Sequence, residues 1–459
     1  MTELRFESKK AQAADLGPES CVPDLLGEHI LQNHLEFRLE EDDEIYEGYG
    51  RRKNAYPYRQ YNGYTRQWNI IYSLGLLMGI GSSVIFSTLK GKSEKEYQNG
   101  NEYFSVAVIG AAFLSVIAWT VIVLFDRELL LFFGAEENLL HLAETYMVPI
   151  KFVVPCFLFV QMLAAFLRND KNPTLATIGV LSGGIFNVFG DYVFVFIFEM
   201  GIFGAGLATA IGSVISCVVM LTHFFSKRNS LHFVKPAKKF SKWKEILVTG
   251  FPTFFIDVAM GILTILFNRQ IMKYLGTNAL SVYGIIVNVS TFVQCCAYSV
   301  GQASQPIVSV NYGVKLGMRI KETLKYALYS VAFFSLFWTV LSLLVPNMFI
   351  RIFMTPTQEI LRIAPAIISC YGLSFLFLPF NIFSTYYFQA ILKSKVSFII
   401  SVTRGLILSG ILIFILPLIN VDYLWLTMPL TELFVAMFAV ITMVRYTKHL
   451  PEKPECIDK

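Results

Sequence analysis

Residues 183–196 read GGIFNVFGDYVFVF and place Asp191 in the middle of an otherwise apolar run. Asn187 stands four residues earlier, so both side chains project from one face of a helix, about one turn or ~5.4 Å apart. A water-soluble core has no use for a carboxyl group in such surroundings, and a lipid bilayer makes its burial costly. The stretch therefore indicates a membrane-crossing helix with a functional acid.

The composition of the whole chain indicates a membrane protein. Of its 459 residues 55% are hydrophobic and only 15% are charged, and the mean hydropathy is +0.55. From about Trp68 onward, apolar runs of about 20 residues recur, each long enough to cross a hydrocarbon core of ~30 Å. They lie near 68–88, 103–125, 147–167, 174–198, 202–225, 246–267, 283–309, 326–350, 364–391, 397–419 and 422–445. We expect an all-α polytopic membrane protein with about eleven spans.

Other residue patterns exclude several classes of protein. The seven cysteines and six histidines show neither a metal-ligand spacing nor an HExxH motif. We therefore expect no enzyme, no structural metal and no cofactor. The net charge of +5 comes from loops and indicates no nucleic-acid partner.

Lys and Arg concentrate in alternate connections, which sets the orientation. The rich connections are 90–95, 168–171, 227–244, 315–325, 393–395 and 445–459. Basic loops stay in the cytoplasm, so we expect a multi-pass plasma-membrane protein with a cytoplasmic C-terminus.

The chain carries an internal repeat with an offset of about 220 residues. Residues 79–91 (GIGSSVIFSTLKG) match residues 301–313 (GQASQPIVSVNYG), and residues 139–143 match 360–364. The repeat predicts two pseudo-symmetric six-helix bundles in parallel orientation. We expect one bundle at 68–225, a basic cytoplasmic linker at 226–245, a second bundle at 246–445 and a cytoplasmic tail at 446–459.

The first helix of the first half is missing from this pattern. The matching segment, about 24–45, is too charged to enter a bilayer. We expect residues 1–67 to form a polar, disordered segment. One hypothesis is a shifted coding frame upstream of Trp68, and the alternative is a lineage with a polar extension and eleven helices.

Two longer motifs and one short one resemble a known family. Residues 167–212, residues 301–313 and FPTFF at 251–255 are similar to the multidrug and toxic compound extrusion (MATE) family of cation-coupled antiporters. The resemblance extends from about Trp68 to the end. It implies twelve helices in two six-helix bundles around a central V-shaped cavity that opens to each side in turn. The chain departs from it at the first helix, where many members carry a coupling aspartate.

A buried set of oxygen groups is predicted in the first half. Thr209, on the next helix, lies about as far from the connecting turn as Asp191, roughly 12–14 Å below the surface. Burial favours the neutral form of a carboxyl group, and oxygen ligands suit hard cations, so the set fits H+ or Na+. The resemblance implies that Asn187, Asp191 and Thr209 form the cation site of many members. Alternatively, these side chains only link neighbouring helices.

The second half has acids of its own, Asp257 and Glu432, both near the midplane. Glu432 matches Thr209 under the repeat, whereas Phe414 matches Asp191, so the two halves differ chemically. Some branches of the family place a sodium site here with an acid on the tenth helix, and residues 364–391 contain none. We expect Asp257 and Glu432 to attract cationic substrate into the cavity.

Three further polar residues lie within spans. Gln302 and Gln305 belong to the family-like motif around Pro306 and are candidates for the substrate cavity or for hydrogen bonds between helices. Arg404 is expected to extend toward the basic inner side.

The sequence predicts a monomeric secondary active multidrug exporter that antiports amphipathic organic cations against H+ or Na+ by alternating access. A flippase of lipid-linked saccharides would share the architecture but should show more cationic groups in its cavity. A transporter remnant, inactive without its first helix, is the other alternative.

Overall fold

The computed structural model describes residues 56–90, 92, 94–132, 140–236, 239–353 and 356–450. Every regular element in these ranges is helical. The first bundle contains α3 (Tyr56–Lys90), α4 (Glu94–Leu124), α5 (Asp126–Phe132), α6 (Leu140–Lys151), α7 (Val154–Asn169), α8 (Pro173–Asp191), η3 (Tyr192–Ile197), α9 (Gly201–Leu221) and η4 (Thr222–Phe225). The second contains α10 (Lys239–Tyr274), α11 (Gly276–Gly313), α12 (Gly317–Leu344), α13 (Pro346–Phe353), α14 (Gln358–Gly372), η5 (Leu373–Leu376), α15 (Leu378–Ala390), α16 (Ser394–Val402), η6 (Thr403–Ile407), α17 (Leu408–Ile419), η7 (Val421–Leu426) and α18 (Thr427–Lys448).

The all-α polytopic fold is confirmed. Within the described ranges ten helices are long and apolar enough to cross a membrane, and α6 with α7 forms an eleventh span bent by 60°. Pro149 lies inside α6, and Pro155 stands in the first turn of α7. Each proline removes a backbone donor, which accounts for the bend between the two helices.

The helix α3 begins twelve residues upstream of the first expected span, at Tyr56. Residues 56–67 are therefore helical, in contrast to the disorder expected for them. The rest of the polar segment, residues 1–55, lies outside the described residues, as do residues 451–459 of the expected tail.

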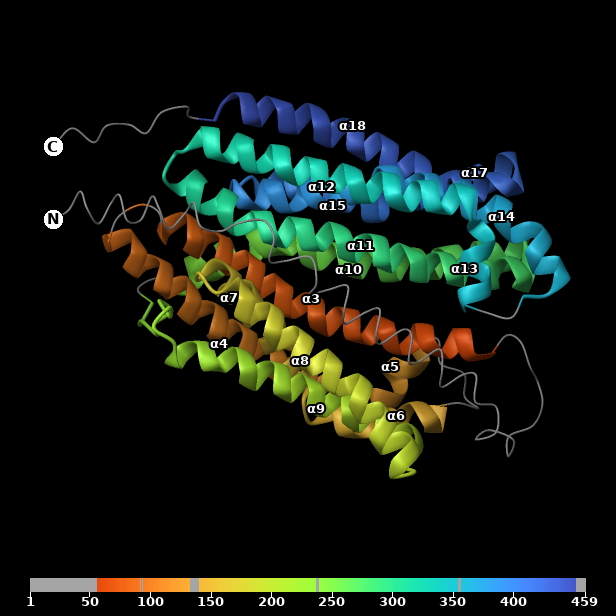
Figure 1. The fold of residues 1–459 in the computed structure, drawn as a ribbon, viewed down its shortest axis with the longest axis horizontal. Helices are drawn as coiled ribbons and strands as arrows, with labels where there is room; N and C mark the ends of the chain where they lie inside the picture. Colours follow the sequence, from red (N-terminus) through yellow and green to blue (C-terminus); the bar gives the residue numbers. More distant parts are fainter. Residues whose placement is uncertain are drawn as a thin grey trace.

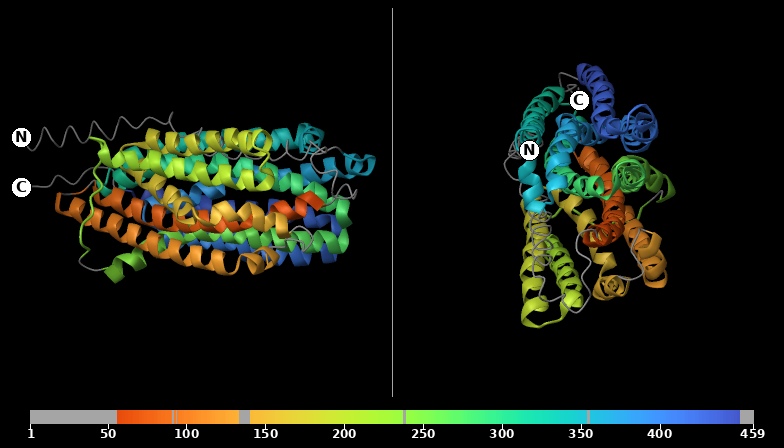
Figure 2. Two further views of the ribbon diagram at one scale, coloured as in Figure 1. Left: turned by 90° about the horizontal axis from the view of Figure 1, so that it is seen from below. Right: turned by 90° about the vertical axis from the view of Figure 1, so that its right-hand side faces the viewer.

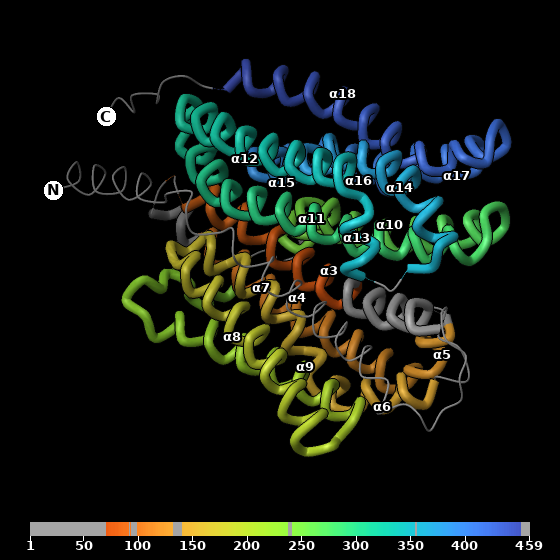
Figure 3. Tube along the Cα trace, turned by 45° about the vertical axis from the view of Figure 1, so that its right-hand side comes forward, coloured from red at the N-terminus to blue at the C-terminus, as the bar shows by residue number. Residues whose placement is uncertain are grey.

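The two bundles form two groups of helices with their long axes roughly along one direction (Figure 1). Seen end on, the helices α4 to α9 and the helices α12 to α18 lie on opposite sides of α3, α10 and α11 (Figure 2). A connection without regular structure, residues 226–236, leads from the first bundle to α10. In the turned view α17 lies beside α14 at the same end of the second bundle (Figure 3).

The bundles meet where α3 packs against α10 and α11. A methyl group on Gly250 would overlap the carbonyl oxygen of Leu77, and one on Gly313 would overlap that of Thr88. These helices therefore touch backbone to backbone, as small residues allow in membrane proteins. Figure 1 shows α3 diverging from α11 toward its own N-terminal end.

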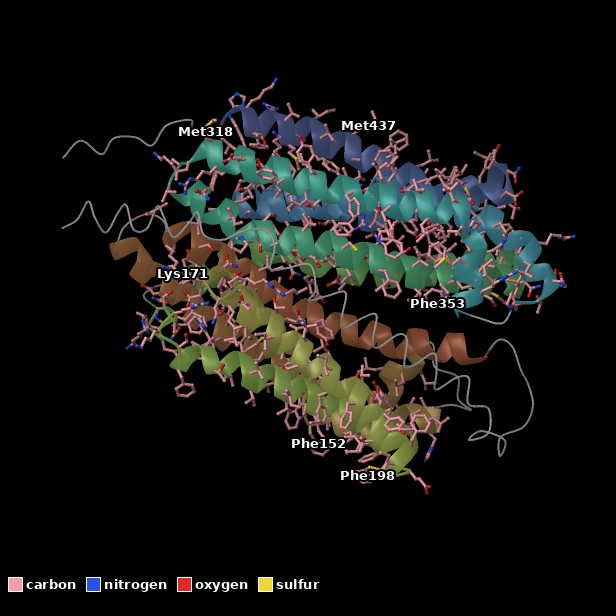
Figure 4. All side chains as sticks on the ribbon, viewed as in Figure 1. Phe152, Lys171, Phe198, Met318, Phe353 and Met437 are labelled. Atoms are coloured by element: carbon pink, nitrogen blue, oxygen red, sulfur yellow. The ribbon has the colours of Figure 1, made fainter. Side chains whose placement is uncertain are left out.

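Lys171 and Met318 lie at one end of the bundles, and Phe198 and Phe353 lie at the other (Figure 4). We call the end with Lys171 the basic end, because α3 reaches Lys90 there and Lys171 follows α7. The glycine contacts with Leu77 and Thr88 belong to the part of α3 nearer this end.

A buried polar cluster at the basic end centres on Asp170, which is fully buried. Its Oδ1 accepts from Lys90 Nζ at 2.5 Å and from the Ser230 hydroxyl. Its Oδ2 accepts from the Ser230 backbone N–H at 2.8 Å and lies 2.9 Å from Nε2 of the buried His223. Burial alone would raise the pKa of Asp170, but the hydrogen bond from His223, the charge of Lys90 and the bonds from Lys90 and Ser230 hold it below its usual value.

Candidate cation site in the first bundle

The structure brings Asn187 and Thr209 together across α8 and α9. The Asn187 amide donates to the Thr209 hydroxyl oxygen at 3.0 Å, and that hydroxyl donates to the carbonyl of Ala205 at 3.1 Å. Asn187 is 8% exposed. The expected contact between these two side chains is thus present in the structure.

Glycines allow α8 and α9 to approach closely around this pair. A Cβ on Gly183 would overlap the Ser216 hydroxyl, and one on Gly212 would stand 2.7 Å from the carbonyl oxygen of Gly183. One turn beyond Asn187, a Cβ on Gly190 would stand 2.9 Å from the Cβ of Ala208. Short polar side chains can therefore meet across the two helices.

Asp191 is the last residue of α8 and is 7% exposed. Its Oδ1 atom is buried and has no hydrogen-bond partner among the described residues. The helix continues directly from Asp191 into the π-helical turn η3. Turns of this type break the regular hydrogen-bond ladder and occur often at functional sites. Because this oxygen accepts no hydrogen bond from the described residues, a proton or a cation can bind to it without breaking one.

Tyr146 of α6 contacts Thr209, and no pattern in the sequence indicated its part in the site. Its hydroxyl lies 3.3 Å from the Thr209 hydroxyl oxygen. A Cβ on Gly206 of α9 would overlap the Tyr146 carbonyl oxygen, so α6 also packs closely here. Tyr146 precedes the bend between α6 and α7, and the direction of α6 depends on that bend.

The site is suited to a hard cation or a proton. Asp191, Asn187, Thr209 and Tyr146 offer oxygen atoms as their acceptors, which hard cations such as Na+ prefer. Within the described residues no group of three or more His, Cys, Asp or Glu stands close enough to hold a metal ion. The structure thus offers a linked set of neutral oxygen groups, Asn187, Thr209 and Tyr146, and a buried carboxylate, Asp191, one helical turn beyond Asn187 on α8.

Asp257 lies half-buried on α10 in the second bundle. The Tyr298 hydroxyl of α11 donates to its Oδ1 atom at 3.3 Å, a long hydrogen bond. The ring of Tyr298 in turn meets Tyr386 edge to face with the ring centroids 6.1 Å apart. Asp257 therefore combines a weakly engaged carboxylate with aromatic neighbours, which suits an organic cation.

Glu432 is fully buried, and its carboxylate is paired. Arg404 Nε donates to Oε1 at 2.7 Å, and the Asn381 amide donates to Oε2 at 2.6 Å. Arg404 is itself only 3% exposed. It does not extend to the basic inner side, and that expectation is wrong. Glu432 offers no free carboxylate in this arrangement, in contrast to the role in attracting substrate expected for it.

Gln302 and Gln305 are buried on α11, at 8% and 3% exposure. The Nε2 atom of Gln305 has no hydrogen-bond partner among the described residues. Gly301, next to Gln302, packs on the ring of Tyr386, where an added Cβ would stand 2.8 Å from ring atoms. Both glutamines therefore lie in the interior of the second bundle, and Gln302 lies near Tyr386.

The two helical bundles, with a buried carboxylate among oxygen groups, define a multi-pass membrane protein of the transporter class. The MatE family model matches residues 61–193 and 252–415, well over half of the chain. The chain belongs to the MatE family, whose members are transporters and not enzymes.

Relatives and solved structures agree with this assignment. The chain is similar to the multidrug export protein MepA of Staphylococcus saprophyticus, with 25% identity over 57% of this chain and 58% of that protein. It is 24% identical to MepA of Staphylococcus aureus over 75% of each chain.

Two solved structures share the fold. A multidrug resistance MATE family transporter of the MOP superfamily in an outward-facing conformation has a TM-score of 0.81 and 17% identity, with 96% of this chain and 97% of that chain covered. A MOP superfamily transporter from Pyrococcus furiosus has a TM-score of 0.79 and 16% identity, with 94% and 99% covered.

Proposed function

We propose that this protein is a secondary active exporter of amphipathic organic cations that exchanges them for inward-moving H+ or Na+. The observation that carries the proposal is the buried Oδ1 atom of Asp191, which has no hydrogen-bond partner in the described part of the chain. The similar staphylococcal proteins are multidrug export proteins, which supports the choice of cargo.

Asp191 with Asn187 and Thr209 binds the coupling ion. A cation there compensates the buried negative charge, which otherwise lacks a counter-charge within the helix pair. The occupied site favours one arrangement of α8, η3 and α9, and the empty site favours another. Coupling follows because a ligand shifts an equilibrium only by its difference in affinity for the two states.

The second bundle supplies the principal contacts to the cargo. Asp257 provides negative charge, Tyr298 and Tyr386 provide aromatic faces, and Gln302 and Gln305 provide neutral hydrogen-bonding groups. An organic cation gains from both the charge and the aromatic rings. Because cargo and coupling ion both neutralise acids within one protein, the binding of each weakens the binding of the other.

The protein works as a monomer in the plasma membrane with the basic end in the cytoplasm. The concentration of Lys and Arg in the connections of that end supports this orientation. The last helix, α18, carries Arg445 and Lys448 in its final turn, which supports a cytoplasmic C-terminus.

The test is export by Asp191→Asn in a drug-sensitive host and in vesicles with an imposed H+ or Na+ gradient. The variant should stay in the membrane at the parent's level and lose gradient-driven export of a cationic dye. Asp422→Asn, which removes an exposed carboxylate, is the matched control and should export like the parent.

Equal export by Asp191→Asn and the parent would refute the assignment of the ion site. A parent that moves no cationic dye under either gradient would instead favour the inactive remnant, and movement of a lipid-linked saccharide would favour the flippase.

A further inference from the structure

Arg404 lies on the helix segment that matches α8 under the internal repeat, ten residues before Phe414, which matches Asp191. Under the internal repeat Glu432 on α18 takes the place of Thr209 on α9. In the first bundle an acid, Asp191, directly precedes the π-helical turn η3. In the second bundle a base, Arg404, lies within the π-helical turn η6. Glu432, on the last helix, thus faces a cation that belongs to the protein itself.

The ion pair of Arg404 and Glu432 is enclosed by protein. The exposed fractions of the two side chains are 4% and 0%. Asn381 reaches Glu432 from α15, and its amide also donates to the Glu432 backbone carbonyl at 2.8 Å. Both carboxylate oxygens are therefore engaged by donors that belong to the protein.

The ion pair is held by packing on several sides. A Cβ on Gly405, next to Arg404, would stand 2.5 Å from the Cβ of Ala259 on α10, so the π-helical turn lies close against that helix. Arg404 also interacts electrostatically with Tyr298 and Tyr371, and Tyr298 interacts with Asp257. The Nη2 atom of the Arg404 guanidinium group has no hydrogen-bond partner among the described residues.

We propose that Arg404 acts as a fixed internal cation that neutralises Glu432, the second bundle's counterpart of Thr209 in the ion site, so that the coupling ion binds only in the first bundle. This inference rests on the proposed function. It makes Arg404 a residue that determines how many ions the transporter takes per cycle. A guanidinium group is positively charged at all physiological pH values and is tethered to its helix, so it cannot exchange with solvent.

A consequence is that removal of the Arg404 charge should create an ion site that the parent lacks. In Arg404→Gln the carboxylate of Glu432 is buried without a counter-charge, and H+ or Na+ can then neutralise it. Asn381 remains to orient the carboxylate. The new site should depend on Glu432 and should vanish in Arg404→Gln/Glu432→Gln.

The experiment measures the melting temperature of purified full-length protein in detergent, since a ligand bound only to the folded state raises it. Each variant is compared in sodium-free and sodium-rich buffers of equal ionic strength, and across a pH series without sodium. All variants are made both in the parent and in Asp191→Asn, so that the proposed ion site of the first bundle is silent in one set.

We expect sodium or acid to raise the melting temperature of Arg404→Gln by at least about 3 °C more than it raises that of the chain in which the substitution was made, either the parent or Asp191→Asn. Arg404→Lys keeps the positive charge and should gain none, and the double variant Arg404→Gln/Glu432→Gln should gain none. The readout does not involve export. A failure of the Asp191 assignment therefore leaves this comparison intact.

The inference is overturned if folded Arg404→Gln shows no added ion dependence, if the double variant retains it, or if Arg404→Lys gains as much. Should Arg404→Gln fail to fold, the double variant decides the question. Arg404→Gln/Glu432→Gln should keep the full ion-dependent rise in melting temperature that the parent shows. Loss of that rise would show that Glu432 binds a coupling ion.

Discussion

Replacement of Asp170 with alanine tests the buried cluster at the basic end. The side chain is fully buried and accepts from Lys90, His223 and Ser230. Without it, the Lys90 ammonium group loses this ion pair in a site where that group is only 13% exposed. Removal of one partner of a buried ion pair costs about 3–5 kcal/mol, a large fraction of a typical free energy of unfolding.

The neighbouring histidine adds to this expected loss. Asn172 Nδ2 lies 3.1 Å from His223 Nδ1 and can donate to it, which leaves the Nε2–H of a neutral His223 to donate to Asp170. Asp170→Ala leaves this donor buried without its acceptor. The free energy of unfolding is measured by denaturant titration in detergent, with tryptophan fluorescence as the signal.

The control is Glu322→Ala, which removes an exposed carboxylate from α12 near the same end and should change the free energy of unfolding by about 0.5 kcal/mol or less. If Asp170→Ala lost no more than this control, the cluster would not contribute as a buried ion pair. Water or another acceptor would then take the place of Asp170 as the hydrogen-bond acceptor for Lys90 and His223.

The same carboxylate sets a pH dependence whose sign follows from its pKa. Folding lowers the pKa of Asp170, so its stabilising contribution is complete above the unfolded-chain value of about 3.9. The contribution is lost as the pH falls below that value toward the lower folded-state pKa. The difference in stability between the parent and Asp170→Ala should thus be constant from neutral pH down to about pH 5 and should shrink below about pH 4. A difference that disappears near neutral pH would contradict the depressed pKa.

Three further substitutions test the ion site and the contact between bundles. Thr209→Val removes the acceptor of Asn187 and should weaken the apparent affinity for the coupling ion about tenfold, measured from the ion dependence of export; an unchanged affinity would contradict the site. Tyr146→Phe removes the 3.3 Å contact with the Thr209 hydroxyl and should change that affinity less than about threefold. Gly250→Ala should destabilise the protein by about 1–3 kcal/mol because its methyl group meets the Leu77 carbonyl, whereas Gly261→Ala, in open space, should not.

The helical spans could be predicted because long apolar runs are a strong signal for membrane helices. All eleven expected spans have a counterpart among the described helices. Their ends were less predictable. Residues 56–67 continue α3 upstream of Trp68, since a helix can extend beyond the hydrocarbon region. The bend between α6 and α7 depends on packing as well as on Pro149 and Pro155.

Part of the site was also predictable. The spacing of Asn187 and Asp191 and the depth of Thr209 below the shared turn follow from helix geometry. That geometry places side chains along a helix, but it does not fix how a third helix approaches. Tyr146 therefore appears only in the structure, because α6 reaches Thr209 through a bend whose direction the sequence does not specify.

The pairing of Arg404 with Glu432 escaped prediction for a related reason. A π-helical turn contains one more residue per hydrogen-bonded loop than an α-helical turn, so it changes the faces on which the flanking residues lie. Arg404 lies within such a turn, and a regular helix drawn through it gives the wrong direction for the side chain. A long basic side chain in a membrane helix usually extends to the interface, and here a buried carboxylate overrides that tendency.

The contacts at the basic end limit how the two bundles can separate. At the contacts of Gly81 with Ile246 and of Gly250 with Leu77 the backbones of α3 and α10 touch, and Ile246 is fully buried in the core of the first bundle, so separation there would expose apolar surface. In addition, Lys242 pairs with Glu102 of α4, close to the start of α10. If this ion pair stays intact while the bundles move, the first turns of α10 remain attached to the first bundle. Such a movement has to bend α10 further along, and Pro252, which removes a backbone donor inside that helix, lowers the cost of a bend there.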